Sequence, residues 1–258
     1  MLSTLTNDIL QAERRSPVSV SRVPFGRRWA SSGEASFVYC VAGALRFESE
    51  SGLFVIREGM ALWCPQGVSV TAASMCGAEL VTVALPWVLE DEERPFAHEC
   101  SPLLCQMMRY LWSAQSEKRA SMPMHPIVQA LQNLLPVWTR GEHSMRLPLP
   151  TDDQLGEALH WMHERLGQSV GPAASAAHVG LSVRSFQRRC QKELGMTPIT
   201  WLQRARIMRS CELLMDLNQS VASVAVACGY RSQASFGRVF KTHMGVTPAI
   251  WRHRSQVD

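Results

Sequence analysis

Long apolar runs are missing from this sequence. The longest, Leu80–Leu89, is interrupted by Thr82 and Pro86 and has about half of the roughly 20 residues that a helix needs to cross a bilayer. The first fifteen residues include Asp8 and Glu13, where a signal peptide has an uninterrupted apolar segment. We therefore expect a cytoplasmic protein that makes no membrane contact.

Paired metal-binding motifs are missing as well. The eight cysteines stand singly and no Cys-x-x-Cys occurs, so neither a disulfide framework nor a zinc site is indicated. None of the eight histidines lies between Gly33 and Trp87, and His160 and His163 share a helix face without a third ligand. We expect reduced and mostly buried thiols, no metal, no cofactor and no enzymatic activity.

Charge is divided unevenly along a chain whose composition suits two globular domains, with 258 residues, 46% of them hydrophobic and 19% charged. Residues 151–258 contain 13 Lys and Arg against 8 Asp and Glu, whereas the first 150 residues contain 13 against 14. A polyanionic partner explains such a concentration, and so does a solvated basic face. Charge alone does not separate the two explanations.

An internal repeat provides the missing information. With an offset of 50 positions, residues 182–201 match residues 232–251 at 8 of 20 positions. The matched pairs are Ser182/Ser232, Ser185/Ser235, Phe186/Phe236, Arg188/Arg238, Gly195/Gly245, Thr197/Thr247, Pro198/Pro248 and Trp201/Trp251. The repeat predicts that one local structure occurs twice.

Each copy has the pattern of a helix with defined ends. A serine suited to cap a helix is followed by an apolar i, i+4, i+8 stripe, then by a glycine and a Thr-Pro pair that end one helix and begin the next. The stripes are Phe186, Cys190, Leu194 and Phe236, Phe240, Met244. A short helix and a glycine turn precede each copy, at 173–180 and 221–229, so we expect two helix-turn-helix units.

In such a unit the second helix enters the major groove and its exposed side chains contact base edges. Arginine can bind guanine and glutamine adenine through paired hydrogen bonds. The face opposite each apolar stripe gives the candidate DNA-binding residues, which are Ser182, Arg184, Ser185, Gln187, Arg188 and Gln191 in the first unit and Ser232, Gln233, Ala234, Ser235, Arg238 and Lys241 in the second. Ala234 offers at most a contact with a thymine methyl group.

A helix over Pro198–Leu217 is predicted between the two units. Its 20 residues correspond to ~30 Å, close to the ~34 Å of one DNA turn, so the units can address two successive major grooves of double-stranded DNA. Arg204, Arg206 and Arg209 on this helix either contact phosphates or are simply solvated.

The run from about Leu166 to Arg254 resembles the DNA-binding domain of the AraC/XylS family of bacterial transcription regulators. The resemblance rests on the motifs Gly180-Leu181-Ser182, Phe186 to Arg189, Gly195 to Pro198, Ser220 to Tyr230, Phe236, Arg238 to Phe240 and Gly245 to Pro248. It implies an all-α domain of seven helices over 151–258 and a sequence-specific regulator, an activator that contacts RNA polymerase. Ser175 and Cys190 depart from the family's usual leucine and phenylalanine.

The first helix of that domain is expected over Thr151–Leu166. Thr151 and Gln154 have the spacing of a capping box. An apolar stripe follows, made of Leu155, Leu159, Met162 and Leu166.

The N-terminal part has the pattern of a small β-barrel. Strands are expected at Ser36–Val41, Leu45–Glu48, Leu53–Ile56, Ala61–Trp63, Val68–Thr71 and Leu80–Leu85. The spacing Gly59-x5-Pro65-x-Gly67 resembles a motif of the cupin fold, whose sensory versions precede AraC-type domains, although Val70 stands where a metal-binding histidine is expected. The resemblance implies a sensory barrel over 1–94.

A barrel without a metal can still enclose an effector. Candidate effector-binding residues are Tyr39, Phe47 and Trp63 as lining and Arg46 as an anchor for an anion, with core packing as the alternative for the aromatic residues. The family also includes members that respond to a protein partner or to none, and the sequence does not choose.

Residues 95–145 are expected to be helical. One apolar face contains Leu104, Met107, Met108, Leu111 and Trp112, and a second contains Ile127, Leu131, Leu134 and Trp138. These helices either form a homodimer, as in related regulators, or pack against their own barrel. Met145–Pro150 is the expected linker.

The sequence therefore predicts an α+β multidomain protein, with a cupin-like β-barrel and flanking helices before an all-α domain with two helix-turn-helix units. Two other functional classes stay open. One is a catalytic cupin fused to DNA-binding helices, which the missing histidines disfavour. The other is a non-specific nucleic-acid binder, whose mark is salt dependence without sequence preference.

Overall fold

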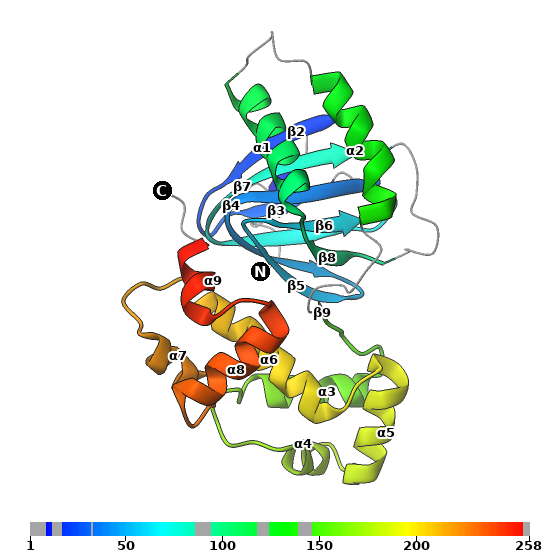
Figure 1. The fold of residues 1–258 in the computed structure, drawn as a ribbon. Helices are drawn as coiled ribbons and strands as arrows, with labels where there is room; N and C mark the ends of the chain where they lie inside the picture. Colours follow the sequence, from blue (N-terminus) through cyan, green and yellow to red (C-terminus); the bar gives the residue numbers. More distant parts are fainter. Residues whose placement is uncertain are drawn as a thin grey trace. The chain divides into compact units, whose positions relative to one another are not determined.

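The computed structural model describes residues 9–11, 17–31, 33–85, 94–117, 124–138 and 146–254. The chain divides into two compact units, one of Met1–Ser144 with Arg254–Asp258 and one of Met145–His253. Strands dominate the first unit and helices the second (Figure 1). The protein is thus a mixed α/β chain with an N-terminal sheet and a C-terminal helical domain.

Two long antiparallel strands, β4 and β7, are the centre of the first unit. One half of β4 pairs with β6, and the other half pairs with β5. In the same way β7 pairs with β2 along one half and with β3 along the other. The strands of this unit are β1 (Ile9–Gln11), β2 (Val18–Val23), β3 (Arg28–Ala30), β4 (Ser36–Ser49), β5 (Gly52–Arg57), β6 (Met60–Cys64), β7 (Thr71–Ala84) and β8 (Phe96–Glu99).

The long strands therefore belong to two half-sheets, β2-β7-β4-β6-β8 and β1-β3-β7-β4-β5. Within the described part of this unit, no pairing joins the outer strands of either half to one another. The sheet is thus not shown to close, and the expected cupin-like barrel is not established by the strand pairing.

Glycine bulges explain why the strands are longer than the sequence predicts. Separate strands were expected on either side of Gly43, but β4 continues through it with register shifts between Cys40 and Ala42 and between Gly43 and Leu45. Gly43 has φ +82°, and a side chain there would overlap the carbonyl oxygen of Gly77 on β7. A bulge at a glycine bends a strand without ending it, so the prediction of a turn at this position was wrong.

Two helices, α1 (Pro102–Ser116) and α2 (Met124–Trp138), cover one face of the β2-β7-β4-β6-β8 half-sheet (Figure 1). Leu104, Met108, Leu111 and Leu131 are fully buried in one cluster that also contains strand residues. The strand members include Phe37, Tyr39, Trp63, Val81 and Val83. The predicted apolar faces thus pack against the chain's own sheet, while the side chain of Trp138 lies outside the described residues.

The region predicted to be helical also contains one strand. Phe96–Glu99 forms β8, which pairs antiparallel with β6. Phe96 and Ala97 are buried, and a short apolar run of this kind does not by itself distinguish a strand from a helix.

The second unit is helical in the described residues, apart from the short strand β9 (Arg146–Leu147). Its helices are α3 (Asp153–His163), α4 (Pro172–His178), α5 (Val183–Leu194), α6 (Pro198–Leu213), α7 (Val221–Ala227), α8 (Gln233–Met244) and α9 (Pro248–Arg254). Leu155, Leu159, Met162 and Leu166 are buried, as the sequence predicts. Among the helices described, none is long and apolar enough to span a membrane.

Two predicted helix boundaries were wrong. The cap of α3 is Asp152, whose carboxylate accepts from the backbone N–H of Leu155 at 2.7 Å, and Thr151 is instead bound to Glu193, so there is no capping box of Thr151 and Gln154. The spacer α6 ends at Leu213, and a turn follows in which Asp216 accepts from the N–H of Asn218. With 16 residues, α6 is about 24 Å long.

A pair of glycine substitutions tests the bulge in β4. Gly43 and Gly67 both have positive φ, but a side chain at Gly67 meets nothing within 4 Å. Gly67→Ala should therefore cost only the left-handed strain of about 1 kcal/mol, whereas Gly43→Ala should cost about 3 kcal/mol because overpacking is added. Urea unfolding of the full chain measures both values. If the two variants lose the same free energy of unfolding, the described close approach of β4 and β7 at Gly43 is wrong.

Candidate nucleic-acid interface

Two helix pairs, α4–α5 and α7–α8, have the same construction. In each pair a glycine with positive φ stands in the turn, Gly180 at +70° and Gly229 at +77°. The second helix of each pair then begins at a serine cap and ends at a left-handed glycine, Gly195 or Gly245. The repeat therefore corresponds to a repeated local structure, as the sequence predicts.

The caps are the predicted ones. Ser182 accepts from the backbone N–H of Ser185 at 3.2 Å, and Ser232 accepts from that of Ser235 at 3.2 Å. The hydroxyl of Ser235 donates to the carbonyl of Ser232 at 2.9 Å. Capping satisfies amide groups that the first turn of a helix leaves without partners, so these serines fix the starts of α5 and α8.

Burial of the apolar stripes determines which faces are free. Phe186 and Cys190 of α5 and Phe236 and Phe240 of α8 are fully buried. Ten of the twelve candidate DNA-binding residues are exposed, namely Ser182, Arg184, Gln187, Arg188, Gln191, Ser232, Gln233, Ala234, Arg238 and Lys241, and the other two, Ser185 and Ser235, are half-buried. The candidates thus form one outward face on each helix.

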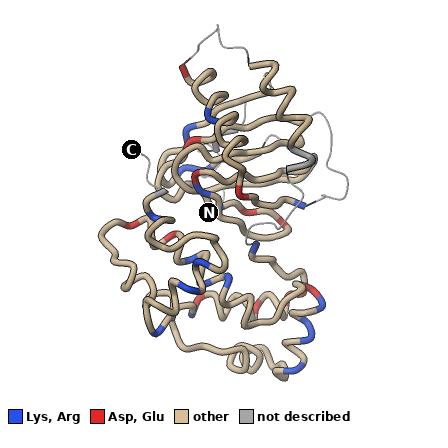
Figure 2. Tube along the Cα trace, viewed as in Figure 1, with Lys and Arg blue, Asp and Glu red and all other residues tan. Residues whose placement is uncertain are grey.

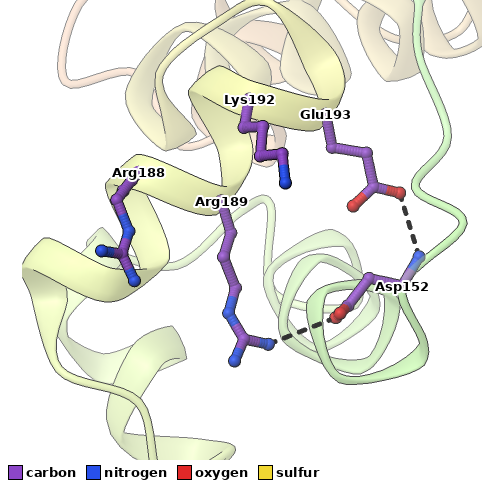
Figure 3. A pocket seen from close by; sticks show the side chains of 5 residues that line it. All are labelled: Asp152, Arg188, Arg189, Lys192 and Glu193. Atoms are coloured by element: carbon purple, nitrogen blue, oxygen red, sulfur yellow. Dashed lines mark hydrogen bonds and ion pairs between the residues drawn. The ribbon is translucent and has the colours of Figure 1, made fainter.

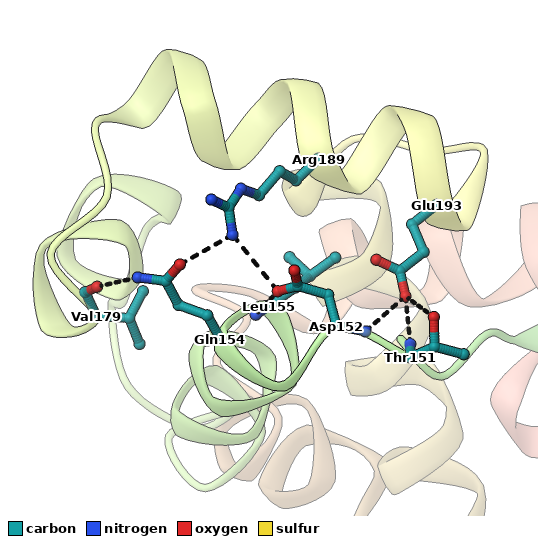
Figure 4. A network of polar contacts seen from close by, with 7 residues as sticks. All are labelled: Thr151, Asp152, Gln154, Leu155, Val179, Arg189 and Glu193. Atoms are coloured by element: carbon teal, nitrogen blue, oxygen red, sulfur yellow. Dashed lines mark hydrogen bonds and ion pairs between the residues drawn. The ribbon is translucent and has the colours of Figure 1, made fainter.

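Polar contacts attach α5 to the start of α3 (Figure 4). Glu193 accepts from the backbone N–H groups of Thr151 and of Asp152, the latter at 2.9 Å, and from the Thr151 hydroxyl at 2.8 Å. Arg189 donates to Gln154 at 2.9 Å and pairs with Asp152 at 3.5 Å. These side chains lie beside the candidate face of α5 and hold the helix in place.

The charge of Glu193 is stabilised by this arrangement. Desolvation raises its pKa, but the N–H of Asp152 and the hydroxyl and N–H of Thr151 outweigh that effect, so the pKa lies below its usual value. This role was not predicted from the sequence. The available signal was the i, i+4 spacing of Arg189 and Glu193, which places both on one side of α5.

A pocket of about 500 Å³ lies where these contacts meet the candidate face; its lining is Asp152, Arg188, Arg189, Lys192 and Glu193 (Figure 3). The carboxylate of Asp152 already pairs with Arg189, and that of Glu193 already accepts from the backbone N–H of Asp152 (Figure 3). The guanidinium of Arg188, by contrast, has no partner among the described residues. The rim of the pocket therefore presents unneutralised positive charge beside the exposed face of α5. Lys and Arg are correspondingly frequent along α5 (Figure 2).

Aromatic packing holds α8. The ring of Phe236 lies 5.3 Å from Tyr230 and 5.5 Å from Phe240, and Phe240 lies 6.0 Å from Trp251 of α9. Such tilted and edge-to-face pairs prefer definite geometries. The outward face of α8 therefore has a rigid support, although it is less polar than that of α5.

The arginines of α6 have internal partners. Arg206 donates to the carbonyls of Leu166 at 3.0 Å and Gln168 at 2.9 Å, Arg204 donates to that of Arg146 at 2.9 Å, and Arg209 pairs with Glu212 at 2.6 Å. These bonds give each of the three a structural role within the domain, so free solvation does not describe them, and phosphate contact stays a prediction. Arg252, whose role was not predicted from the sequence, acts similarly by donating to the carbonyls of Leu214 and Gln219.

The candidate effector-binding residues lie in the first unit. Tyr39, Phe47 and Trp63 are fully buried. Tyr39 and Trp63 share the cluster beneath α1 and α2, whereas Phe47 packs edge-on against Trp29 at 5.9 Å. Arg46 is half-buried. The structure thus does not bring the four together, and the core alternative fits the three aromatic residues.

Substitution of Glu193 tests the attachment of α5. Glu193→Ala removes three hydrogen bonds to the start of α3 and should lower the free energy of unfolding by about 0.5–1 kcal/mol at pH 7. Because its folded-state pKa is depressed, this contribution is complete above the unfolded pKa of about 4.3 and disappears as the pH falls through the folded value. Urea unfolding at pH 7 and pH 3.5 gives the difference. The exposed neighbour Gln191→Ala is the control and should leave the free energy of unfolding nearly unchanged at both pH values. A loss in Glu193→Ala that is as large at pH 3.5 as at pH 7 would contradict the assignment.

Part of the helical unit is similar to a known family of domains. Residues 175–254 match the family described as a helix-turn-helix domain. The HTH-type transcriptional activator RhaS of Escherichia fergusonii is 29% identical over 98 residues, which cover 38% of this chain and 35% of that protein. The chain thus spans about a third of the length of the curated relatives that it matches.

Two solved structures are also similar to parts of this chain. An AraC-type transcriptional regulator from Chromobacterium violaceum is 27% identical, with 41% of this chain and 96% of that chain covered and a TM-score of 0.39. ToxT from Vibrio cholerae with a bound unsaturated fatty acid is 12% identical, with 92% and 94% covered and a TM-score of 0.40. The C-terminal part of this chain is thus similar to the helix-turn-helix domains of transcription regulators, and its motifs resemble those of the AraC/XylS family.

Proposed function

We propose that this protein is a sequence-specific DNA-binding transcription regulator, an activator, and that α4–α5 and α7–α8 are its two helix-turn-helix units. The observation that carries the proposal is the contrast between two groups of arginines. Arg184, Arg188 and Arg238, on the exposed faces of α5 and α8, have no side-chain partner among the described residues. By contrast, the arginines of α6 and Arg189 are bound to carbonyls or carboxylates, as described above.

Such unpartnered cations suit a polyanion. An exposed guanidinium gains charge-assisted hydrogen bonds from a phosphate, or two parallel bonds from guanine in the major groove. Gln187, Gln191 and Gln233 stand exposed beside them and can bind adenine in the same way. A face that mixes cations with amides suits recognition of base edges better than charge neutralisation alone.

Both exposed faces are held by one rigid element, because α6 packs against α5 and against α8. At about 24 Å, α6 is shorter than the ~34 Å repeat of B-DNA. Contact with two successive major grooves therefore requires α5 and α8 to lie beyond the ends of α6, or the DNA to bend toward the protein. If α5 and α8 do not extend beyond the ends of α6, the difference in length predicts that the bound DNA is bent toward the protein.

The first unit is proposed as the sensory part. In this proposal residues 1–94 form a cupin-like sensor for a small molecule or a protein, residues 95–145 connect it, and residues 151–258 bind DNA in the cytoplasm, where RNA polymerase is the partner of an activator. The inner faces of α1 and α2 are already covered by the sheet. A homodimer formed through these helices would use their outer faces, where Leu103 is 58% exposed.

Binding measurements with two arginine variants test the DNA-contact assignment. Duplexes are first selected from a random pool by the full-length chain, and the affinity of each variant is then measured for the selected and for random duplexes. Arg188→Ala and Arg238→Ala should each weaken binding to the selected duplex by about tenfold to a hundredfold, because a bidentate base contact is lost. Binding to random duplexes should fall much less.

The control removes the same charge elsewhere. Arg22 of β2 is 73% exposed and pairs with Glu79, so Arg22→Ala should leave both affinities unchanged. If neither Arg188→Ala nor Arg238→Ala alters binding to the selected duplex, the assignment of the reading faces is wrong. Equal losses on selected and random duplexes would instead indicate a non-specific binder.

A further inference from the structure

Two cysteines meet at the start of α1. Ser101 caps this helix by accepting from the N–H of Leu104 at 3.3 Å. Cys100 therefore stands just before the cap and Cys105 at the fourth helical position, the two positions whose side chains pack together in a hydrophobic staple. Accordingly, the sulfur of Cys105 lies 3.7 Å from the carbonyl oxygen of Cys100 and 3.9 Å from that of Gly59, and both thiols are free.

Polar groups surround this pair on the sheet side. The hydroxyl of Tyr39 on β4 is fully buried and has no hydrogen-bond partner of ordinary geometry in the part of the chain that is described. The electrostatic neighbours of that hydroxyl are Cys105, Arg109 and Cys100. Arg109 stands one turn after Cys105 and forms an ion pair with Glu58. A buried hydroxyl without an acceptor is costly, and a thiolate at Cys105 would provide one.

The pKa values of the two thiols are shifted in opposite directions. The pKa of Cys105 is lowered to about 6, chiefly by a hydrogen bond from the Cys100 thiol. The Tyr39 hydroxyl and the charge of Arg109 act in the same direction, and together these effects outweigh that of burial, which raises the pKa. Burial raises the pKa of Cys100 well above its usual value. Elsewhere in the chain, burial raises the pKa of Cys64 to about 12. A thiolate is the reactive form of cysteine, so at neutral pH Cys105 has the nucleophile's character and Cys100 does not.

The two thiols also differ in their exposure to solvent. Cys100 is buried, whereas Cys105 is only partly covered and lies at the edge of the cluster beneath α1. A small oxidant from solvent therefore reaches Cys105 first, with Cys100 behind it.

We propose that Cys105 and Cys100 form a peroxide-reactive dithiol in the first unit, with Cys105 as the attacking thiolate and Cys100 as the resolving thiol. The Cys105 thiolate attacks one oxygen of hydrogen peroxide, the O–O bond breaks, and the released hydroxide takes up a proton to become water. The resulting sulfenic acid is then attacked by the Cys100 sulfur, which forms the disulfide and releases a second water. An external dithiol returns both cysteines to the reduced state by thiol–disulfide exchange.

Mass spectrometry of the full-length chain tests this chemistry. The reduced protein is exposed to hydrogen peroxide, quenched with N-ethylmaleimide and digested. The expected result is a disulfide linking Cys100 to Cys105, reversed by dithiothreitol, formed at least about tenfold faster than any oxidation of Cys64. Cys105→Ser should remove the fast phase, and Cys100→Ser should stop at a sulfenic acid on Cys105 that dimedone captures. Cys64→Ser is the matched control and should oxidise as the wild-type chain does.

A second measurement follows the alkylation of Cys105. The rate of alkylation of Cys105 by iodoacetamide in the wild-type chain, followed by peptide mass as a function of pH, should reach half its maximum near pH 6, and Tyr39→Phe should shift this midpoint upward. A midpoint near 9, or a Cys105 that oxidises no faster than Cys64, would overturn the proposal. So would fast oxidation that persists in Cys105→Ser.

Discussion

The helical domain depends on the burial of two short apolar stripes. A helix turns by about 100° per residue, so once Phe186, Cys190 and Leu194 face the core, the direction of every other side chain on α5 follows. The same holds for Phe236, Phe240 and Met244 on α8. The exposed arginines and glutamines are thus placed by buried residues on the opposite side of each helix, and the caps at Ser182 and Ser232 decide where each face begins.

Polar groups around the stripes then limit how the helices can move. Glu193 and Arg189 attach α5 to α3, and Arg206 and Arg252 each donate to two backbone carbonyls at chain turns. Interactions of charged groups with backbone partners are stronger than neutral ones. Some cationic side chains of the domain therefore stabilise its packing, while others have no partner among the described residues. The surface that contains the second group suits an anionic partner.

The first unit depends on strand pairing instead of helix stripes. Its sheet is built on β4 and β7, which pass from one half-sheet to the other through glycine bulges, and α1 and α2 cover one of the halves. The same packing that buries Tyr39 beneath α1 brings its hydroxyl to the two cysteines at the helix start. A structural device, the hydrophobic staple, thereby places two sulfur atoms together.

Much of the helical domain could be predicted from the sequence because its signals are local. Caps, stripes and terminating glycines act within one or two turns, and the repeat shows each of them twice. The start of α3 could not be predicted, since Thr151 and Asp152 are both good caps and the choice depends on Glu193, some 40 residues away. The continuity of β4 likewise depends on Gly77 across the sheet, and a glycine that permits a bulge looks like one that permits a turn.

The pairing of Cys100 with Cys105 was missed because their spacing matches no metal or redox motif and becomes meaningful only when the cap at Ser101 is located. The candidate contacts of α5 and α8 were predicted as a set, and the structure places ten of the twelve in exposed positions. Whether they contact bases depends on a partner that neither the sequence nor the fold contains.

Methylation interference on a selected duplex tests the central claim most directly. If α5 and α8 are held by α6 as a bipartite reading surface, methylation of guanine N7 should block binding in two clusters, centred about one helical turn apart on the same face of the DNA. A single cluster, or interference confined to the minor groove, would contradict the account.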